Sequence, residues 1–139
     1  MPLASSINVP GYEQVVRYED PVNDLIAFIA IHDTVLGPAL GGCRTFPYTD
    51  EEKALEDVLR LSRGMTYNSA MAELPYGGGK SVIIGDPHKH KTEGLLTAFG
   101  DFVDSLNGRY ITAEDVGTSA ADMETIRRQA RHVAGLPDQ

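Results

Sequence analysis

The chain has 139 residues, 42% of them hydrophobic and 23% charged, which is typical of a single globular domain. Its net charge of −8 argues against non-specific binding to nucleic acid or anionic membranes. It has no apolar run near the ~18 residues of a membrane span and no secretory signal at its start, so we expect a cytoplasmic protein.

The first elements are predicted to form a β-hairpin. Residues 12–17 are expected to form a strand and residues 20–23 a turn. Residues 25–31 are a continuous apolar run of strand length, which predicts a strand buried on both faces. The first strand of this hairpin is a candidate edge strand that could pair with a second subunit.

A loop and a long helix are predicted next. Residues 37–42 contain three glycines and a proline and are expected to form a loop. The first helix is expected to begin near Thr49, which has capping-box spacing to Glu52. Apolar residues then follow a helical stripe that runs past Gly64 towards Ala70.

The second half of the chain is predicted to alternate strands and helices, which indicates an α/β fold. The expected elements are a glycine-rich turn at 75–79, a short buried strand at 81–84, a helix carrying apolar residues 95–106 and stopping at Asn107–Gly108, a strand at 109–112, and a helix opened by Ser119 and Asp122 with Met123, Ile126 and Ala130 inward. Residues 135–137 resemble the start of a linker.

Residues 74–81 read LPYGGGKS, which is close to a phosphate-binding P-loop. Leu74 stands where the first glycine of that motif should be, and the segment follows a helix and enters a strand, so a P-loop is disfavoured. Glycines also let backbone approach a small ligand closely. A partly buried lysine such as Lys80 is suited to act as a base, because burial favours the neutral amine. A tight turn followed by an exposed lysine explains the same residues.

Two acidic residues, Glu114 and Asp115, lie between the strand at 109–112 and the next helix. A carboxylate near Lys80 would form a proton-transfer pair. The alternatives are that Asp115 supports the following helix or that both acids are solvated, and the sequence alone does not show whether Asp115 and Lys80 meet.

The histidines and the cysteine are not expected to form a metal or catalytic site. The four histidines lack metal-ligand spacing, so no metal site is expected. The single cysteine, Cys43, has no base near it in the sequence and is interpreted as a small packing residue, with its free thiol fitting a reducing compartment.

Four stretches in register resemble the Glu/Leu/Phe/Val family of amino-acid dehydrogenases, and most closely its leucine, phenylalanine and valine dehydrogenases. They are GPALGGCR (37–44), RLSRGMTY (60–67), LPYGGGKSVIIGDP (74–87) and NGRYITAEDVGT (107–118). The resemblance implies the amino-terminal substrate-binding and oligomerisation domain of such an enzyme, spanning residues 1–139. The expected architecture is three-layer α/β/α around a small, mostly parallel mixed sheet.

The resemblance also implies the roles of individual residues. Lys80 corresponds to the general base that activates water at the imino carbon, and Asp115 to the acid partner that shuttles protons. The substrate-binding positions implied are Leu40, Gly41, Gly42, Met65, Asn68, Gly77, Gly78 and Ala113. Leu40 and Ala113 are apolar, which indicates an apolar amino acid and its 2-oxo acid as the small-molecule partners rather than glutamate.

Two departures from the family pattern limit this interpretation. The family has a lysine that binds the substrate carboxylate where this chain has Asn68, and Arg44 is a possible substitute cation. The chain also lacks a G-x-G-x-x-G motif, so we expect the NAD-binding Rossmann domain to be absent, no cofactor-binding residue here, and no turnover by this chain alone. The resemblance implies NAD as cofactor and at least a homodimer. The alternative function is a non-enzymatic binding or assembly domain derived from the family.

Overall fold

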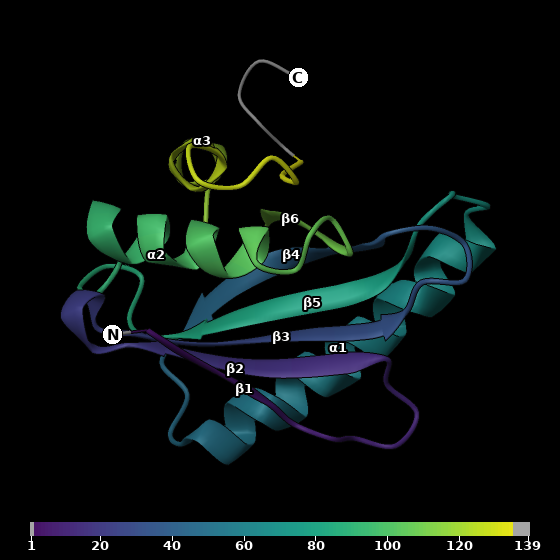
Figure 1. The fold of residues 1–139 in the computed structure, drawn as a ribbon, viewed down its shortest axis with the longest axis horizontal. Helices are drawn as coiled ribbons and strands as arrows, with labels where there is room; N and C mark the ends of the chain where they lie inside the picture. The colour runs from purple at the N-terminus through teal and green to yellow at the C-terminus, as the bar shows by residue number, and fades with distance from the viewer. Residues whose placement is uncertain (1, 135–139) are drawn as a thin grey trace.

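The computed structural model describes residues 2–134, which form one six-stranded sheet with helices on both faces (Figure 1). The strands are β1 (Leu3–Ser6), β2 (Gln14–Asp20), β3 (Leu25–Asp33), β4 (Ala39–Phe46), β5 (Gly77–Ile84) and β6 (Tyr110–Glu114). The helices are α1 (Glu51–Met71), α2 (Glu93–Asp104) and α3 (Ala120–Arg127), with a 3-10 turn, η1, at Pro21–Asn23.

The strand order is β1-β2-β3-β5-β4-β6. The pairings β1–β2, β2–β3 and β3–β5 are antiparallel, whereas β4 is parallel to both β5 and β6. The α/β class and the mixed sheet are therefore confirmed. The expectation that the sheet is mostly parallel is wrong, because the amino-terminal strands meander antiparallel onto the parallel unit.

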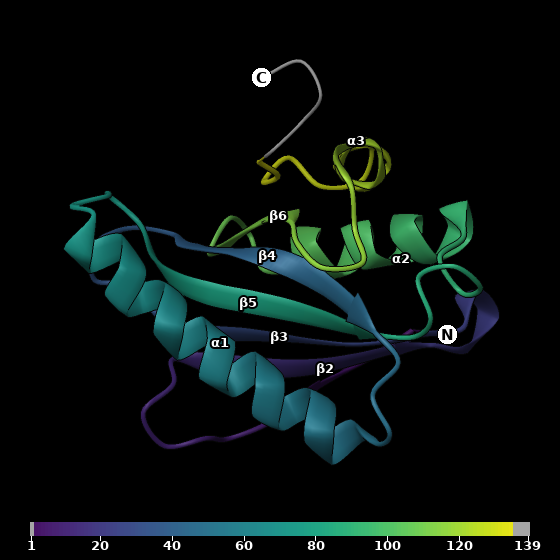
Figure 2. The same cartoon turned by 180° about the vertical axis from the view of Figure 1, so that it is seen from behind.

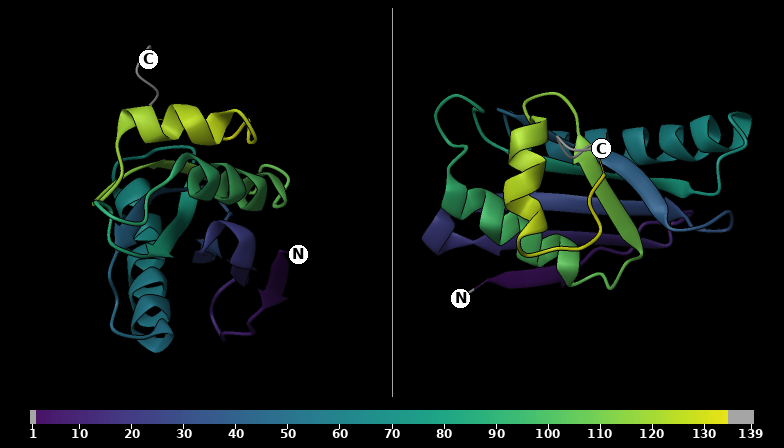
Figure 3. Two further views of the ribbon diagram at one scale, coloured as in Figure 1. Left: turned by 90° about the vertical axis from the view of Figure 1, so that its left-hand side faces the viewer. Right: turned by 90° about the horizontal axis from the view of Figure 1, so that it is seen from above.

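The three predicted layers are present. Helix α1 lies across one face of the sheet, mainly on β5 and β3 (Figure 2). Helix α2 covers the opposite face, and α3 crosses over α2 on its outer side (Figure 3). Among residues 2–134, no helix combines the length and the apolarity needed to cross a membrane.

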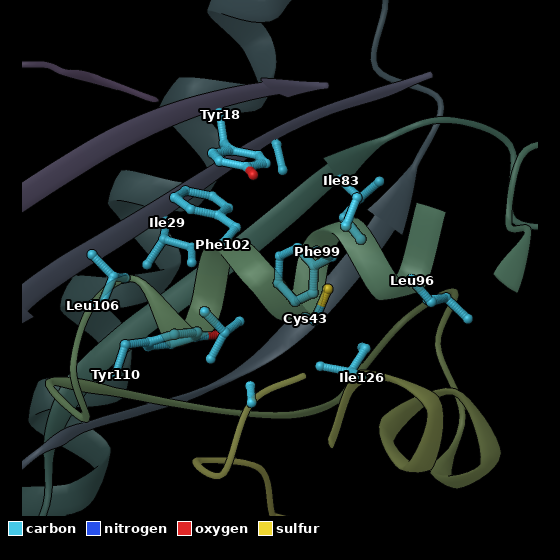
Figure 4. Close-up of a cluster of buried hydrophobic side chains, with 14 of the residues drawn as sticks. Tyr18, Ile29, Cys43, Ile83, Leu96, Phe99, Phe102, Leu106, Tyr110 and Ile126 are labelled. Carbon is cyan, nitrogen blue, oxygen red and sulfur yellow. The ribbon is translucent and has the colours of Figure 1, made fainter. Parts of the chain in front are cut away.

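Each face of the sheet has its own hydrophobic core. On the α2 side, Phe99 and Phe102 of the helix pack on strand residues such as Ile29 and Ile83 (Figure 4). Cys43 is fully buried in this core, and its burial raises the pKa of the thiol, as expected of a packing residue. A smaller core under α1 contains Val15, Phe28, Ala30, Ala54, Val58 and Val82.

The predicted hairpin is confirmed, since β2 and β3 pair antiparallel across η1. The Asp20 carboxylate closes this turn by accepting a hydrogen bond from the backbone N–H of Val22. The first strand begins two residues later than predicted and extends to Asp20. It is not an edge strand, because β1, which was not predicted, pairs with it.

Helix α1 is confirmed with a shifted start. Its N-cap is Asp50, whose carboxylate accepts from the backbone N–H of Lys53 at 2.8 Å, so the predicted capping box at Thr49 and Glu52 is wrong by one position. The helix runs through Gly64 to Met71, as its apolar stripe indicates.

The predictions for the later elements differ in accuracy. The capping box of Ser119 and Asp122 is present, and Met123 and Ile126 are buried as predicted. Helix α2 ends at Asp104, a little before the predicted stop, while Asn107 and Gly108 adopt positive φ angles of 54° and 84° that turn the chain towards β6. The linker predicted at 135–137 lies outside the described residues.

The glycine-rich segments were misjudged. The predicted loop at 37–42 is largely the start of β4, and the predicted turn at 75–79 is largely the start of β5. Glycine weakens an isolated strand, but here the missing side chains let neighbouring chains pack closely. A Cβ on Gly41 would lie 1.6 Å from the carbonyl oxygen of Gly79.

Gly79 makes room for a buried tyrosine that joins the parallel strands. A Cβ on Gly79 would lie 2.8 Å from the Tyr110 ring and 2.9 Å from the Cβ of Ala39. The Tyr110 hydroxyl, which is fully buried, donates to the carbonyl of Gly41 at 2.6 Å and lies 2.8 Å from the Ser81 hydroxyl. The Tyr110 side chain on β6 thus connects β4, through Gly41, with β5, through Ser81.

We predict that Gly79→Ala destabilises the protein by about 1–3 kcal/mol, because the added methyl group overpacks the core. The matched control is Gly64→Ala in α1, where no atom lies within 4 Å of the added Cβ. This change should stabilise the protein by roughly 0.5–1 kcal/mol, because alanine is the better helix former. Urea denaturation of both variants measures the difference, and equal effects at the two positions would contradict this packing role of Gly79.

Candidate active site

The sheet topology brings together the two residues expected to perform proton transfer. Lys80 lies in β5 and Asp115 directly follows β6, and β4 separates the two strands. The Lys80 Nζ lies 2.8 Å from the Asp115 Oδ2, so the two groups form an ion pair. The prediction that they meet, which sequence alone left open, is confirmed in geometry.

A missing side chain on β4 makes this contact possible. Gly42 is the β4 residue that pairs with Ala113 of β6. A Cβ on Gly42 would lie 2.7 Å from the Cβ of Asp115 and 2.7 Å from the carbonyl oxygen of Glu114. Any larger residue at position 42 would therefore displace Asp115 from its approach to Lys80.

The pair lies at the boundary between protein and solvent. The Lys80 side chain is 7% exposed and the Asp115 side chain 23%. The site faces the α1 side of the sheet, where α1 packs on β5 and β3 but makes little contact with β4 (Figure 2). The 23% exposure of the Asp115 side chain leaves part of this carboxylate group accessible to solvent.

The charge of Asp115 is stabilised by its surroundings. Burial alone raises the pKa of its carboxyl group, but the hydrogen bond and charge of Lys80 oppose this effect. A backbone hydrogen bond from Val116 and the charge of Arg44 also favour the ionised form. The net effect is a pKa of Asp115 below its usual value, so the group is a carboxylate at neutral pH.

Some of the predicted substrate-binding residues lie next to this pair. Leu40 and Gly42 lie two residues apart on β4, and they pair with Ile111 and Ala113 on β6. Leu40 and Ala113 are both half-buried. These positions form a small apolar surface beside Asp115, and their role in binding remains a prediction.

The other predicted glycines are packed against protein backbone. A Cβ on Gly77 would lie 1.9 Å from the carbonyl oxygen of Asp33, and one on Gly78 would lie 2.0 Å from the Thr66 Oγ1 on α1. Both glycines are buried within β5. Close packing of β3 and α1 thus accounts for their lack of side chains, and their contact with a ligand remains a prediction.

The structure also removes the P-loop interpretation. Residues 77–84 form a strand in the interior of the sheet, whereas a P-loop is a turn that leads from a strand into a helix. The segment carries Lys80 on a rigid element rather than on a phosphate-binding loop.

Two of the predicted substrate-binding positions, Met65 and Asn68, lie on α1. Met65 is half-buried, and Asn68 is exposed in the last turns of the helix. Arg44 does not replace a cation at position 68. Its guanidinium contacts Asp57, which lies about three helical turns, or roughly 16 Å, before Asn68 on α1.

Sequence reasoning missed a group of residues that adjoins the ion pair. Arg44 Nε lies 3.2 Å from the Asp115 Oδ2, and its Nη1 lies 3.4 Å from the Asp57 Oδ2. The Tyr48 hydroxyl also donates to Asp57. Sequence analysis named Arg44 without placing it, and the alternation of side chains along β4, in which Leu40, Gly42 and Arg44 share one face, is the signal that would have placed it beside Gly42.

Comparison with known proteins identifies the family. Residues 12–132 match the model of the Glu/Leu/Phe/Val dehydrogenase dimerisation domain. The chain belongs to this family. It is 57% identical over 136 residues to leucine dehydrogenase of Geobacillus stearothermophilus, a match covering 98% of the chain and 37% of the enzyme. It is 60% identical over 125 residues to valine dehydrogenase of Streptomyces virginiae, covering 90% and 35%.

Solved structures agree with this assignment. The crystal structure of L-tryptophan dehydrogenase from Nostoc punctiforme is similar with a TM-score of 0.86 and 54% identity, covering 88% of this chain and 36% of that one. Glutamate dehydrogenase of Thermus thermophilus, at 24% identity and a TM-score of 0.74, shares the fold. The dehydrogenase domain described here therefore spans a little over one third of the length of these relatives.

Within residues 2–134 of this dehydrogenase domain, no group of three or more His, Cys, Asp or Glu side chains is arranged to hold a metal ion. The site's charged groups are Lys80, Asp115, Arg44 and Asp57. The chemistry available to it is proton transfer and the binding of a polar or anionic group.

We predict that the stabilising effect of Asp115 depends on pH. Its folded pKa is lowered, so its contribution to stability is present above the unfolded pKa and is lost as pH falls through the folded pKa. Asp115→Asn should lower the free energy of unfolding by about 1–3 kcal/mol at pH 7. The difference from the wild type should shrink as pH falls below the usual aspartate value of 3.8.

Asp101→Asn provides a control of opposite sign. Burial and the charges of Asp104 and Asp20 raise the pKa of Asp101, so its ionised form opposes folding. This variant should be no less stable than the wild type at pH 7. Urea unfolding between pH 3 and pH 7 measures both variants, and a pH-independent effect of Asp115→Asn would contradict the assignment.

Proposed function

We propose that this domain binds an apolar L-amino acid and supplies the general base of an amino-acid dehydrogenase. The overall reaction is conversion of the amino acid, oxidised NAD and water into a 2-oxo acid, ammonium, NADH and a proton. The observation that carries the proposal is the 2.8 Å contact between the nearly buried Lys80 Nζ and the Oδ2 of the partly exposed Asp115. Relatives at 53–60% identity are named leucine, phenylalanine and valine dehydrogenases, which supports the same reaction class.

Lys80 and Asp115 have distinct tasks in this proposal. Lys80 in its neutral form removes a proton from the water that attacks the imino carbon. Asp115 receives that proton from Lys80 or returns one to the departing amine. The burial of Lys80 fixes its position, and the partial exposure of Asp115 leaves a path for proton exchange with solvent.

The substrate side chain would lie against Leu40 and Ala113. Both are apolar and half-buried on adjacent strands. A carboxylate on the substrate side chain, as in glutamate, would need a cation or hydrogen-bond donors, which these two residues cannot supply. An aliphatic or aromatic side chain therefore fits this surface better than that of glutamate.

The described residues do not fit NAD by themselves. The pyrophosphate of a dinucleotide rests on a G-x-G-x-x-G turn at the start of a helix, and the chain has no such motif. The proposal therefore assigns NAD, which accepts the hydride from the substrate, to a separate Rossmann domain. The greater length of the relatives leaves room for such a domain.

The proposal includes assembly and location. The family model describes a dimerisation domain, which supports at least a homodimer. The single free thiol of Cys43 supports a reducing compartment, and we place the protein in the cytoplasm. No nucleic-acid or membrane partner is part of the proposal.

A chimera tests the proposed function. This chain would replace the matching 37% of the Geobacillus stearothermophilus leucine dehydrogenase, and NADH formation would be measured with leucine, valine and phenylalanine. We expect turnover with at least one of them, and a loss of at least about 10²-fold in kcat for Lys80→Ala, the range of general-base catalysis. The intact relative controls for assembly, and turnover unaffected by Lys80→Ala would contradict the proposal.

The same chimera tests the alternative, a non-enzymatic binding or assembly domain, which is favoured by Asn68. Asparagine carries no charge, and losing a charge-assisted contact costs roughly 1–3 kcal/mol, or about 5- to 150-fold in substrate binding. Asn68→Lys should lower KM by such a factor if the site is active. If the chimera is inactive with all three amino acids and Asn68→Lys restores activity, the result would support the alternative. If the chimera is inactive with either residue at position 68, the enzymatic role would be overturned.

A further inference from the structure

Asp115 contacts a second cation besides Lys80, its proposed proton-transfer partner. The Nζ of Lys80 and the Nε of Arg44 approach the same oxygen, Oδ2, at 2.8 and 3.2 Å. The two cations come from adjacent strands, β5 and β4. Oδ2 is therefore fixed from two directions.

Arg44 is itself held in place from α1. Its Nη1 contacts the Asp57 Oδ2 at 3.4 Å, and the Asp57 side chain is 18% exposed. Arg60 Nη2 holds the other oxygen of Asp57 at 2.7 Å, and the Tyr48 hydroxyl donates to Oδ2. Burial, and then the Asp57 carboxylate, raise the pKa of Tyr48, so its hydroxyl remains a donor. These contacts fix the guanidinium that faces Asp115.

The two cations differ in how constant their charge is. A lysine that serves as a general base must become neutral during the cycle, whereas an arginine stays charged at any physiological pH. Each time Lys80 loses its proton, Asp115 loses its closest positive charge. Arg44 is the charge that remains on the same carboxylate oxygen.

The burial of Asp115 is the reason that this constant charge matters, because burial alone raises the pKa of its carboxyl group. The acidic groups near the site are Glu114, which precedes Asp115, and Asp57, which contacts Arg44 and Tyr48. Asp122 at the start of α3 is paired with Lys91 at 2.7 Å. With Lys80 neutral and Arg44 absent, burial would favour protonation of Asp115.

We propose that Arg44 is a positioning residue that keeps Asp115 ionised and directed at Lys80 while Lys80 changes its protonation state. The inference rests on the proposed function, because only a proton-transfer role makes Lys80 neutral. It assigns Asp57 and Tyr48 as the groups that hold Arg44 in place.

The test follows the pKa of Asp115 by NMR of the carboxyl carbons in ¹³C-aspartate-labelled 139-residue protein. Lys80→Met represents the neutral lysine. Adding Arg44→Met to it should raise the pKa of Asp115 by a further unit or more, on the order expected for loss of a close opposite charge. Arg44→Lys in the same background should restore part of that shift.

Arg17→Met in the Lys80→Met background is the matched control. Arg17 is also ion-paired, to Glu19 and Glu51, and its side chain is 22% exposed against 23% for Arg44. It should leave the pKa of Asp115 unchanged. An equal effect of Arg17→Met and Arg44→Met, or no effect of Arg44→Met in a folded protein, would overturn the inference.

A measurement on the unaltered protein covers the case in which Arg44→Met does not fold. The ¹⁵Nε signal of Arg44 should titrate with the same pKa as the Asp115 carboxyl carbon. An Arg44 ¹⁵Nε chemical shift that does not change as Asp115 titrates would contradict the contact between these two side chains. Neither measurement needs turnover, so failure of this inference is distinguishable from failure of the dehydrogenase chimera.

In an active chimera, the same role predicts a separate kinetic result. Arg44→Met should move the acidic limb of the kcat–pH profile to higher pH, with a smaller change in KM, and Arg44→Lys should move it back. A uniform loss of activity at every pH would indicate only a structural role and would contradict the proposal.

Discussion

The contact between Lys80 and Asp115 depends on one constraint, which is that the strand between them carries no side chain at position 42. Strand β4 lies between β5 and β6, so a side chain at position 42 would separate the two groups. A methyl group at Gly42 would already overlap the Cβ of Asp115. The sheet order and this glycine together place a nearly buried ammonium against a partly exposed carboxylate.

Close packing at glycines also explains why the glycine-rich segments were hard to interpret from sequence. Glycine has a low strand propensity, and residues 37–42 and 75–79 therefore suggest a loop and a turn. Tertiary packing decides otherwise, because β4 and β5 are central strands and Tyr110 fills the space above Gly79. Elements with local signals were predicted well: the β2–β3 hairpin, and the capping box of Ser119 and Asp122.

The candidate site likewise contains some residues that the sequence indicated and others that only the fold brings together. Motifs shared with the dehydrogenase family indicated Lys80 and Asp115, and the sheet brings them together. Arg44, Asp57 and Tyr48 were not found as a group, because they come from β4, from α1 and from the segment between them. Their contacts depend on how α1 lies across the sheet, which no local pattern in the sequence encodes.

The most direct test of the account is a double-mutant cycle on Lys80 and Asp115. The free energy of unfolding at pH 7 would be measured for the wild type, Lys80→Met, Asp115→Asn and the double variant. A contact of this kind predicts a favourable coupling free energy between roughly 0.5 and 3 kcal/mol. Additive effects, with coupling within about 0.3 kcal/mol of zero, would contradict the claim that these two groups meet.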